Sequence, residues 1–542
     1  MKRFNQITKM IILMLGTIVT LFACSNMGLL ANNSFLFLTK NDVSVWVVSS
    51  LERIKREDPA RSKTHIELYA GRGEYEAFQI GIKAPKTGLK NVKVEVSDLY
   101  SFNNQVIPKT NITLYREHYV HVKHSSPNKR GSTNSPSGPG WYADGLIPFL
   151  NPEDKTNLTG AELDAVPFNL KAKHNQPIWV DIFVPRETKP GQYQGSYTVS
   201  SDRGVVTGKI LLKVWNFELP LKPSLNSEFS FYEHHDKRDM IELLKHKIMP
   251  EAHFDPADEI ELIKQWGLRS RGLSFWSGAN GKSCKMEPAP SVEEIKTTAA
   301  QHQSTLFLYA RYADEIDECQ NLIEPMKQWA RNLHKAGVST VIAMTPNPAL
   351  YDDGSGTKRS VVDIWTVLPK MYDDVPERIS EVLQKKGKVW SYNALVQDSY
   401  SPKWQIDFDP INYRIQPGFI SQSLGLTGIL YWRVDLWTKD PWNDIETYFQ
   451  EDNRYPGEGM LVYPGKQVGI KGVVPSIRLK NLREGVEDYE YIEILKRLGR
   501  GNWALQVSRG VGSSWKNWTR DTKVLESARL RLGKEIERLS AK

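Results

Sequence analysis

The chain of 542 residues is poor in cysteine and has no long hydrophobic run. It contains three Cys, with no CxxC motif and no Cys-His cluster, so the sequence predicts no structural zinc site. Its one strongly apolar stretch, residues 10–22, is too short to span a bilayer comfortably. HExxH and a Gly-rich phosphate loop are both missing. We therefore expect neither a metal nor a cofactor.

An excess of basic charge is also missing. The formal net charge is +8, and Lys2, Arg3 and Lys9 supply three of those charges near the N-terminus. No run of Lys and Arg is interleaved with aromatic residues in the way that nucleic-acid-binding surfaces require. The composition therefore argues against nucleic acid as a partner.

The N-terminus has the pattern of an export signal. Lys2 and Arg3 precede the apolar residues 10–22, and the segment ends in Leu-Phe-Ala before Cys24. Because this ending resembles a bacterial lipobox, we expect residues 1–23 to be a lipoprotein signal peptide and Cys24 to carry the lipid. The alternative is an ordinary signal peptide followed by a chance Cys.

Residues 24–40 are expected to form a tether behind this anchor. Ser25 rather than Asp follows the Cys, as in lipoproteins sent on to an outer membrane. We expect an exported protein that meets the membrane only through its anchor, facing the periplasm or the cell surface. In that oxidising setting Cys284 and Cys319 could pair, although sequence cannot bring them together.

Residues 41–222 show short alternating runs broken by turn residues, which indicate an antiparallel β-sandwich domain. Beyond Pro220 and Pro223 the rhythm changes. Short apolar runs now alternate with amphipathic helical segments, which predicts a parallel sheet. Seven strands are expected to begin near residues 228, 272, 305, 340, 364, 389 and 428, with a possible eighth at Met460–Tyr463.

This count predicts a (β/α)8 barrel over residues 223–475. The charged segment 476–542 carries apolar residues at helical spacing. We expect it to be a helical extension that covers part of the barrel.

Such a barrel places its functional residues at the carboxyl ends of the strands. The run 305–312 leads directly into Asp314 and Glu315, so two adjacent carboxylates follow a strand. Acids also cap free amides at helix starts, and a second Asp-Glu pair at residues 258–259 shows that the dipeptide alone is weak. The position of Asp314 and Glu315 after a strand favours a functional role.

Aromatic and charged residues follow other strands and could form a platform for a sugar. The candidates are Trp390, Tyr392, Arg414, Trp432 and Trp437. Each aromatic residue could instead be barrel packing, and Arg414 could instead form a structural salt bridge.

Acids and aromatic rings at one face suit cleavage of a glycosidic bond, which needs a proton donor and a stabilised sugar carbon. Neighbours on a strand point to opposite sides, so Asp314 and Glu315 cannot flank the bond as separate strands would. Beyond the strand end, one carboxyl can protonate the leaving group while the other holds a 2-acetamido group that itself attacks.

Several passages between about residue 110 and residue 495 carry a family resemblance. They are residues 141–148, 175–181, 312–315, 428–432, 461–465, 475–479 and 483–491. Together they resemble glycoside hydrolase family 123, whose known members are β-N-acetylgalactosaminidases. The resemblance implies a β-sandwich followed by a (β/α)8 barrel and a retaining, substrate-assisted mechanism. In that scheme Glu315 matches the general acid/base, and Asp314 matches the residue that orients the acetamido group.

The leading hypothesis is thus an exo-acting β-N-acetylhexosaminidase of glycans that contain N-acetylgalactosamine. A glycosidase with another sugar specificity on the same fold is the first alternative. A lipid-anchored glycan-binding protein without activity is the second, because a barrel alone does not fix function.

Overall fold

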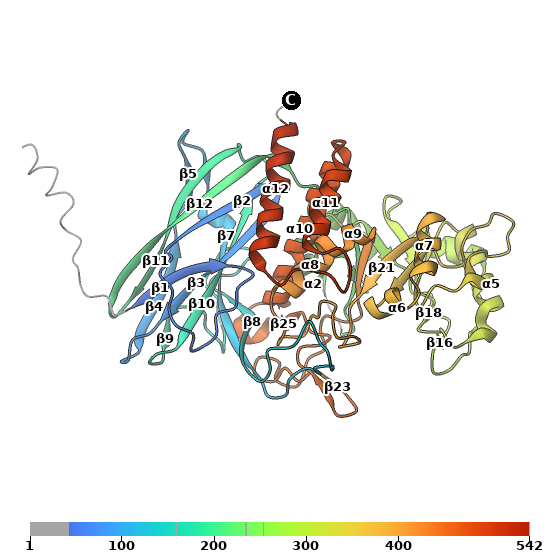
Figure 1. The fold of residues 1–542 in the computed structure, drawn as a ribbon, viewed down its shortest axis with the longest axis horizontal. Helices are drawn as coiled ribbons and strands as arrows, with labels where there is room; N and C mark the ends of the chain where they lie inside the picture. The colour runs from blue at the N-terminus through green and yellow to red at the C-terminus, as the bar shows by residue number, and fades with distance from the viewer. Residues whose placement is uncertain (1–42, 159, 234–235, 253, 541–542) are drawn as a thin grey trace, which may run out of the picture.

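The computed structural model describes residues 43–158, 160–233, 236–252 and 254–540. Two β-sheets come first, a barrel follows, and three helices end the chain (Figure 1). The predicted lipid attachment residue, Cys24, lies outside the described residues. No helix in the described ranges is both long enough and apolar enough to cross a membrane.

The two N-terminal sheets have five and seven strands. The first has the order β1 (Ser44–Ser49), β3 (Glu74–Lys83), β10 (Asn175–Val184), β7 (Ile112–Val122) and β8 (Gly140–Pro148), all antiparallel. The second has the order β2 (His65–Arg72), β12 (Gly204–Glu218), β11 (Gly191–Ser201), β4 (Leu89–Val96) and β9 (Phe168–Leu170). In addition, β5 (Leu99–Ser101) pairs with β11, and β6 (Val106–Ile107) pairs with β5.

One hydrophobic core joins the two sheets. Ile80 and Val180 reach it from the first sheet, and Ile210 and Leu212 from the second. The alternation of buried and exposed residues along β12 aims its apolar residues inward, as the period of a strand requires. The pairing of β2 with β12 is parallel, so the second sheet is mixed rather than purely antiparallel.

Eight parallel strands form a nearly closed barrel sheet. In chain order they are β13 (Asn226–Ser230), β14 (Pro250–Glu251), β15 (Ser270–Gly272), β17 (Phe307–Ala310), β19 (Ser339–Ala343), β20 (Ile364–Val367), β21 (Lys388–Tyr392) and β22 (Gly428–Tyr431). No pairing joins β14 to β15 among the described residues. Arg271 spans that gap and donates to the carbonyls of Ala252 at 2.9 Å and Phe254 at 3.1 Å.

Seven of these strands lie where the sequence predicts them, but the eighth does not. Met460–Tyr463 was expected to close the barrel, and this expectation was wrong. The segment instead leads into β25 (Val462–Pro464), which forms an antiparallel hairpin with β26 (Val473–Pro475). The barrel strand that the sequence did not predict is β14, whose two residues are too few to show a periodic pattern.

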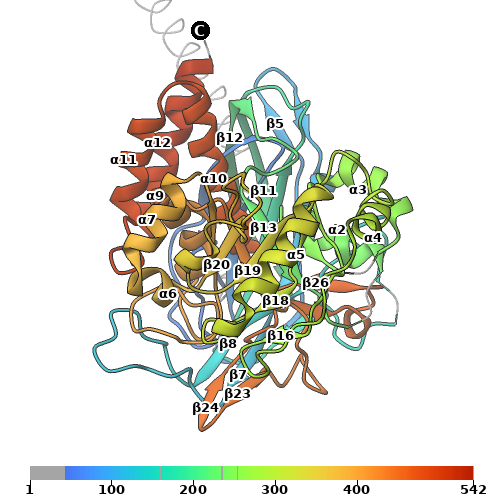
Figure 2. The same cartoon turned by 90° about the vertical axis from the view of Figure 1, so that its right-hand side faces the viewer.

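Helices surround the barrel strands: α2, α3 and α4 lie on one side and α6 and α7 on the other (Figure 2). They are α2 (Lys237–Lys245), α3 (Glu259–Trp266), α4 (Val292–Ala299), α5 (Ile323–Lys335), α6 (Pro369–Asp374), α7 (Pro376–Gln384), α8 (Ile411–Ile415) and α9 (Ser421–Leu424). Local signals fix their ends. Asp236 and Asp239 form a capping box at the start of α2, and Gly267 ends α3 in a left-handed conformation.

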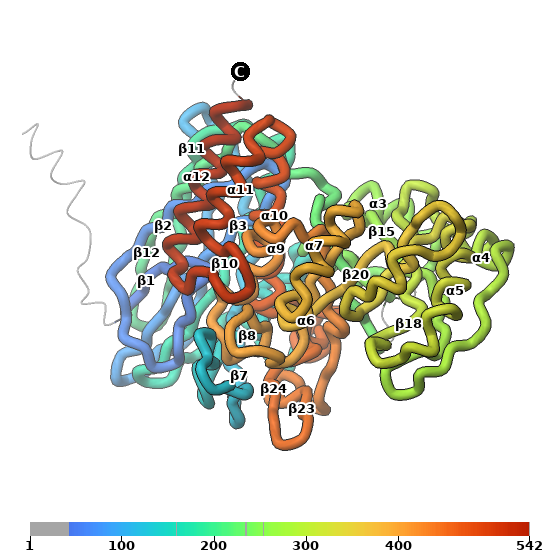
Figure 3. Tube along the Cα trace, turned by 45° about the vertical axis from the view of Figure 1, so that its right-hand side comes forward, coloured from blue at the N-terminus to red at the C-terminus, as the bar shows by residue number. Residues whose placement is uncertain are grey.

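The last three helices are α10 (Ile477–Arg497), α11 (Gly501–Val511) and α12 (Thr522–Ser540). Helix α10 lies between the N-terminal sheets and the barrel (Figure 1) and is buried along most of its length. Its buried charges are paired: Arg478 bonds Asp144 of β8, and Lys480 bonds Asp181 of β10. Helix α12 lies beside strand β12 of the second sheet (Figure 3). Its Gly533 packs on Trp215 of β12.

Candidate active site

Asp314 and Glu315 lie where strand β17 leaves the barrel. After Ala310 the chain continues into β18 (Ala313–Asp314), which pairs with β16 (Ala279–Asn280) rather than with a barrel strand. Asp314 is therefore held at the barrel mouth by a second, small parallel sheet. The mouth is the end at which a parallel barrel presents its functional side chains.

The backbone turns sharply at Glu315, whose φ is +49°. A left-handed conformation costs a residue with a Cβ roughly 1–2 kcal/mol. The Glu315 amide donates to the carbonyl of Ala343, at the end of β19, over 2.9 Å and so holds the turn. Because alternation along the strand ends here, Asp314 and Glu315 need not point to opposite sides.

A disulfide fastens this turn to its neighbour. Cys284 and Cys319 are bonded, with their Cα atoms 5.2 Å apart. Between them the backbones pack tightly: a Cβ on Gly281 would lie 2.4 Å from the carbonyl oxygen of Glu315. The pairing that the sequence left open is thus present, and it braces the segment that carries both carboxylates.

Burial raises the pKa of both carboxyl groups. For Asp314, burial is the main cause, and the Arg311 guanidinium opposes it. For Glu315, burial raises the pKa first, the charges of Asp314 and Asp317 add to it, and Lys282 lowers it. Such a rise keeps a carboxyl protonated at higher pH, which a general acid requires.

Tyr392, at the end of β21, and Arg311, which follows β17, both lie close enough to Asp314 to interact with its charge. The pKa of the half-buried Tyr392 phenol is raised mainly by burial and next by the charge of Asp314, with smaller contributions from Glu315 and Glu458. Arg311 lowers that same pKa. The hydroxyl of Tyr392 is therefore close enough to both acids for their charges to raise its pKa.

Trp432 provides a half-buried ring at the same mouth. Its indole nitrogen donates to Glu458 over 2.9 Å, and the rings of Tyr232 and Tyr448 meet it edge-on. Glu458 is fully buried and also accepts the amide of Leu395 at 3.1 Å. The ring is thus fixed in place before any ligand arrives.

Two predicted substrate-binding residues lie elsewhere. Trp390 has no exposed surface: it fills the barrel interior one layer below Tyr392, against Gly428 and Tyr309. Sequence alternation correctly put Trp390 and Tyr392 on one side of β21 but could not tell their depth. Trp390 is therefore corrected from a sugar platform to barrel packing.

Arg414 is also corrected. It is 2% exposed, and its guanidinium bonds Asp488 at 2.7 and 3.0 Å and lies 3.3 Å from Glu484. These partners are on α10, so the arginine joins α8 to the last helices. Trp437 is partly buried and donates to the Val462 carbonyl at 2.9 Å, which ties it to the β25 hairpin.

The structure adds residues that the sequence did not single out. A cavity of about 230 Å³ opens between the ends of β13, β14, β15 and β17, and Glu228, Arg311 and Trp276 line it. Trp276 is 50% exposed. Trp276 follows a predicted strand, and this position could have marked it as a site residue. Nothing in the sequence marks the buried Glu458.

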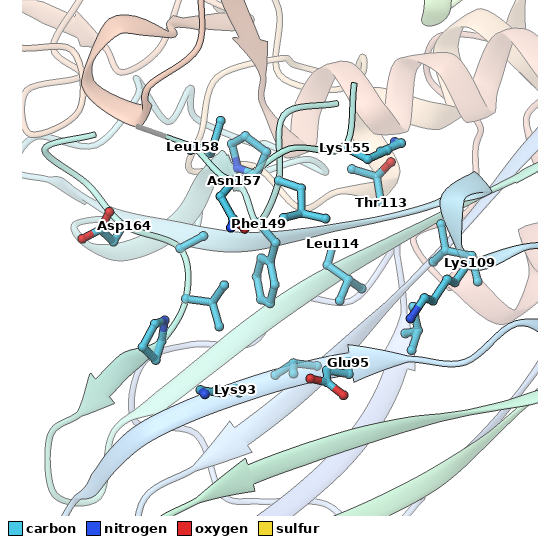
Figure 4. Close-up of a pocket in the computed structure, with 18 of the residues that line it drawn as sticks. Lys93, Glu95, Lys109, Thr113, Leu114, Phe149, Lys155, Asn157, Leu158 and Asp164 are labelled. Atoms are coloured by element: carbon cyan, nitrogen blue, oxygen red, sulfur yellow. The ribbon is translucent and has the colours of Figure 1, made fainter. Parts of the chain in front are cut away.

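A larger cavity lies away from this mouth. About 690 Å³ opens between β4 and β7 of the N-terminal sheets, with Phe149 and Leu114 in its wall (Figure 4). None of the residues discussed above lines it. Its size therefore does not make it the catalytic site.

Comparison with known proteins gives the family of the chain. Residues 47–201 match the family described as glycoside hydrolase 123 N-terminal domain, and residues 315–495 match glycoside hydrolase 123, catalytic domain. The chain belongs to glycoside hydrolase family 123. The family 123 enzymes are glycoside hydrolases, and so is this protein. The catalytic match starts at Glu315 and leaves Asp314 just outside.

A solved family 123 glycoside hydrolase from Clostridium perfringens, described in terms of glycolipid glycan hydrolysis, has the same fold. It superposes with a TM-score of 0.64 at 15% identity, over 92% of this chain and 99% of that one. A Parabacteroides merdae β-glucuronidase matches at a TM-score of 0.25 and 11% identity, over 77% of this chain and 50% of that one. No curated protein sequence matches the chain.

Proposed function

We propose that this family 123 glycoside hydrolase is an exo-acting, retaining β-N-acetylgalactosaminidase, in which the 2-acetamido group of the substrate is the nucleophile. Glu315 is the general acid/base and Asp314 orients the acetamido group. Tyr392 and Trp432 form the wall against which the sugar binds.

The observation that carries the proposal is a contrast among the acids at the barrel mouth. Three of them already accept a hydrogen bond from a neighbouring side chain: Glu228 from Arg311, Glu251 from the Tyr309 hydroxyl, and Glu458 from the Trp432 indole. The carboxylates of Asp314 and Glu315 accept no hydrogen bond from any described residue. These two are therefore free to contact a substrate.

The proposed reaction has two steps. Glu315 gives its proton to the glycosidic oxygen as the bond to C1 breaks, and the acetamido oxygen bonds to C1. Asp314 accepts a hydrogen bond from the acetamido N–H and stabilises the positive charge of the oxazolinium. In the second step Glu315 removes a proton from water, which attacks C1 and restores the acetamido group with overall retention.

A panel of chromogenic substrates tests the sugar. We expect hydrolysis of the β-N-acetylgalactosaminide and no turnover of the β-galactoside that lacks the acetamido group, because substrate assistance needs that group. Equal turnover of both would contradict the acetamido mechanism and favour a glycosidase with a protein nucleophile. No turnover of any sugar, with a folded chain, would leave the glycan-binding alternative.

Replacing Lys282 with Met is expected to shift the pH profile. Lys282 lowers the pKa of Glu315, so its removal raises that pKa and the acid stays protonated to higher pH. The alkaline limb of kcat/KM should therefore move up by a few tenths of a pH unit, less at high salt, because Lys282 is exposed. Lys285→Met, three residues along the same loop, is the control, and an equal shift there would refute the assignment.

We also propose that the regions flanking the barrel, residues 41–222 and 476–542, act as a β-sandwich domain and a helical extension that hold it in place. The mature protein would be exported and lipid-anchored through Cys24. The disulfide supports export, because such bonds persist in oxidising compartments. Labelled fatty acid should enter the wild-type chain and not Cys24→Ala; labelling of both would disprove the anchor.

A further inference from the structure

A small charged cavity lies between the N-terminal sheets and the barrel, far from Asp314 and Glu315 in the fold. It has a volume of about 160 Å³ and is bounded by β7, β10, the segment after β8, α2 and α10. We call it the interface pocket. Lys155, Lys245, Lys480, Arg483, Asp181 and Glu242 are its charged lining residues besides His246.

The interface pocket holds more positive than negative charge. Four cations line it against two carboxylates. Asp181 is fully used, because it accepts Lys480 at 2.8 Å and Arg483 at 2.6 and 3.0 Å. Glu242 lies 3.8 Å from Lys245. The ammonium group of Lys155 has neither an ion pair nor a hydrogen bond with a described residue.

The titration of these groups agrees with a deficit of negative charge. Burial lowers the pKa of Lys155, and the neighbouring charge of Lys245 lowers it further. Burial also lowers the pKa of Lys480, in spite of its contact with Asp181. His246 has a pKa well below its ordinary value, so it adds no charge at neutral pH. An anion would relieve the repulsion among these cations.

Hydrogen-bond donors in the pocket are also unused. The hydroxyl of Tyr115, a residue only 4% exposed, bonds no described residue, and Nε of the buried Arg483 has no partner there. Buried polar groups are normally hydrogen-bonded, and each exception calls for an explanation. Lys155 lies beside Thr113 in Figure 4, and its side chain points away from the apolar Phe149.

Size narrows the class of ligand. Pockets for whole small molecules usually measure about 300–1,000 Å³, so this one is too small for a sugar residue with its neighbours. Several donors that converge from different elements suit an ion with three or four oxygens, for which Lys and Arg are the usual partners. We propose that the interface pocket binds a phosphate or sulfate oxyanion, either free or as the terminal group of a larger ligand.

Such an ion would join parts of the chain that are distant in sequence. Lys155 and Tyr115 belong to the N-terminal sheet region, Lys245 to a barrel helix and Lys480 to α10. Binding to the folded state alone stabilises it by mass action. The proposal does not depend on the sugar that the enzyme cleaves, because no residue of the barrel mouth is involved.

Calorimetric titration and thermal unfolding of the full chain test the site. Inorganic phosphate and sulfate should bind saturably and raise the melting temperature above that in sodium chloride of equal ionic strength. Glucose 6-phosphate, which lacks the acetamido group, separates the two sources: tighter binding than inorganic phosphate indicates a terminal group, and weaker binding indicates a free ion. No saturable effect of any of the three would overturn the proposal.

Variants locate the site. Lys155→Met and Tyr115→Phe should each weaken anion binding about tenfold, because each removes one contact to a charged ligand. Tyr115→Phe leaves no partner unsatisfied and should unfold like the wild type when the anion is absent. Lys109→Met removes an exposed lysine nearby and is the control. Wild-type affinity in both pocket variants, or an equal loss in the control, would refute the site.

Discussion

Replacing Glu315 with Gln is expected to lower kcat on a disaccharide substrate by about 10²- to 10⁴-fold, the usual contribution of general acid–base catalysis. The amide keeps the shape of the side chain but has no proton to give to the glycosidic oxygen. Stability should hardly change, because Glu315 is exposed apart from its partly buried carboxyl group, and that group bonds no described residue. Steady-state rates beside thermal unfolding check both statements.

The leaving group distinguishes an acid from a residue that merely shapes the site. A nitrophenyl glycoside leaves without much help from an acid, so Glu315→Gln should lose less activity on it than on a disaccharide. Glu318→Gln, on the same segment and also exposed, is the matched control. Equal losses on both substrates, or a comparable loss in the control, would remove Glu315 from the acid role.

The position of the site at the barrel mouth could be predicted because strand ends are visible in the sequence. Apolar runs show where β17 and β22 end, and the topology of a parallel barrel brings those ends together. The turn at Glu315 could not be predicted. Its positive φ depends on the amide bond to Ala343, which belongs to another strand. A single sequence carries no sign of that contact.

The sequence also could not predict how deep a side chain lies in the barrel. Trp390 and Tyr392 share one face of β21, yet one has no exposed surface and the other reaches the mouth. The two side chains differ by a single layer of packing. Trp390 occupies the space beside Gly428 of the neighbouring strand, where there is no side chain. Periodicity gives the face of a residue and not the height of the layer.

Arg414→Ala is expected to lower the free energy of unfolding by about 3–5 kcal/mol, the usual effect of removing one partner from a buried ion pair. Asp488 and Glu484 would remain buried with one cation fewer, because Asp488 would keep only Arg529 and Glu484 only Arg483. The pKa of Asp488 is already raised by burial and lowered by Arg414, so the variant raises it further. A buried carboxyl with a raised pKa destabilises the fold only when it is ionised. The loss should therefore be smaller at pH 5 than at pH 8.

Kinetics then separate this structural role from the sugar contact that the sequence suggested. The KM of the folded Arg414→Ala enzyme should match that of the wild type, because Arg414 is buried against α10 and not at the mouth. Arg61→Ala removes a half-exposed arginine paired with Glu52 and should cost at most about 1 kcal/mol. Combining Arg414→Met with Asp488→Leu should recover part of the lost stability, since both partners of that pair are then removed, while Glu484 keeps Arg483 and Arg529 keeps Glu74. A raised KM with unchanged stability would instead return Arg414 to the substrate site.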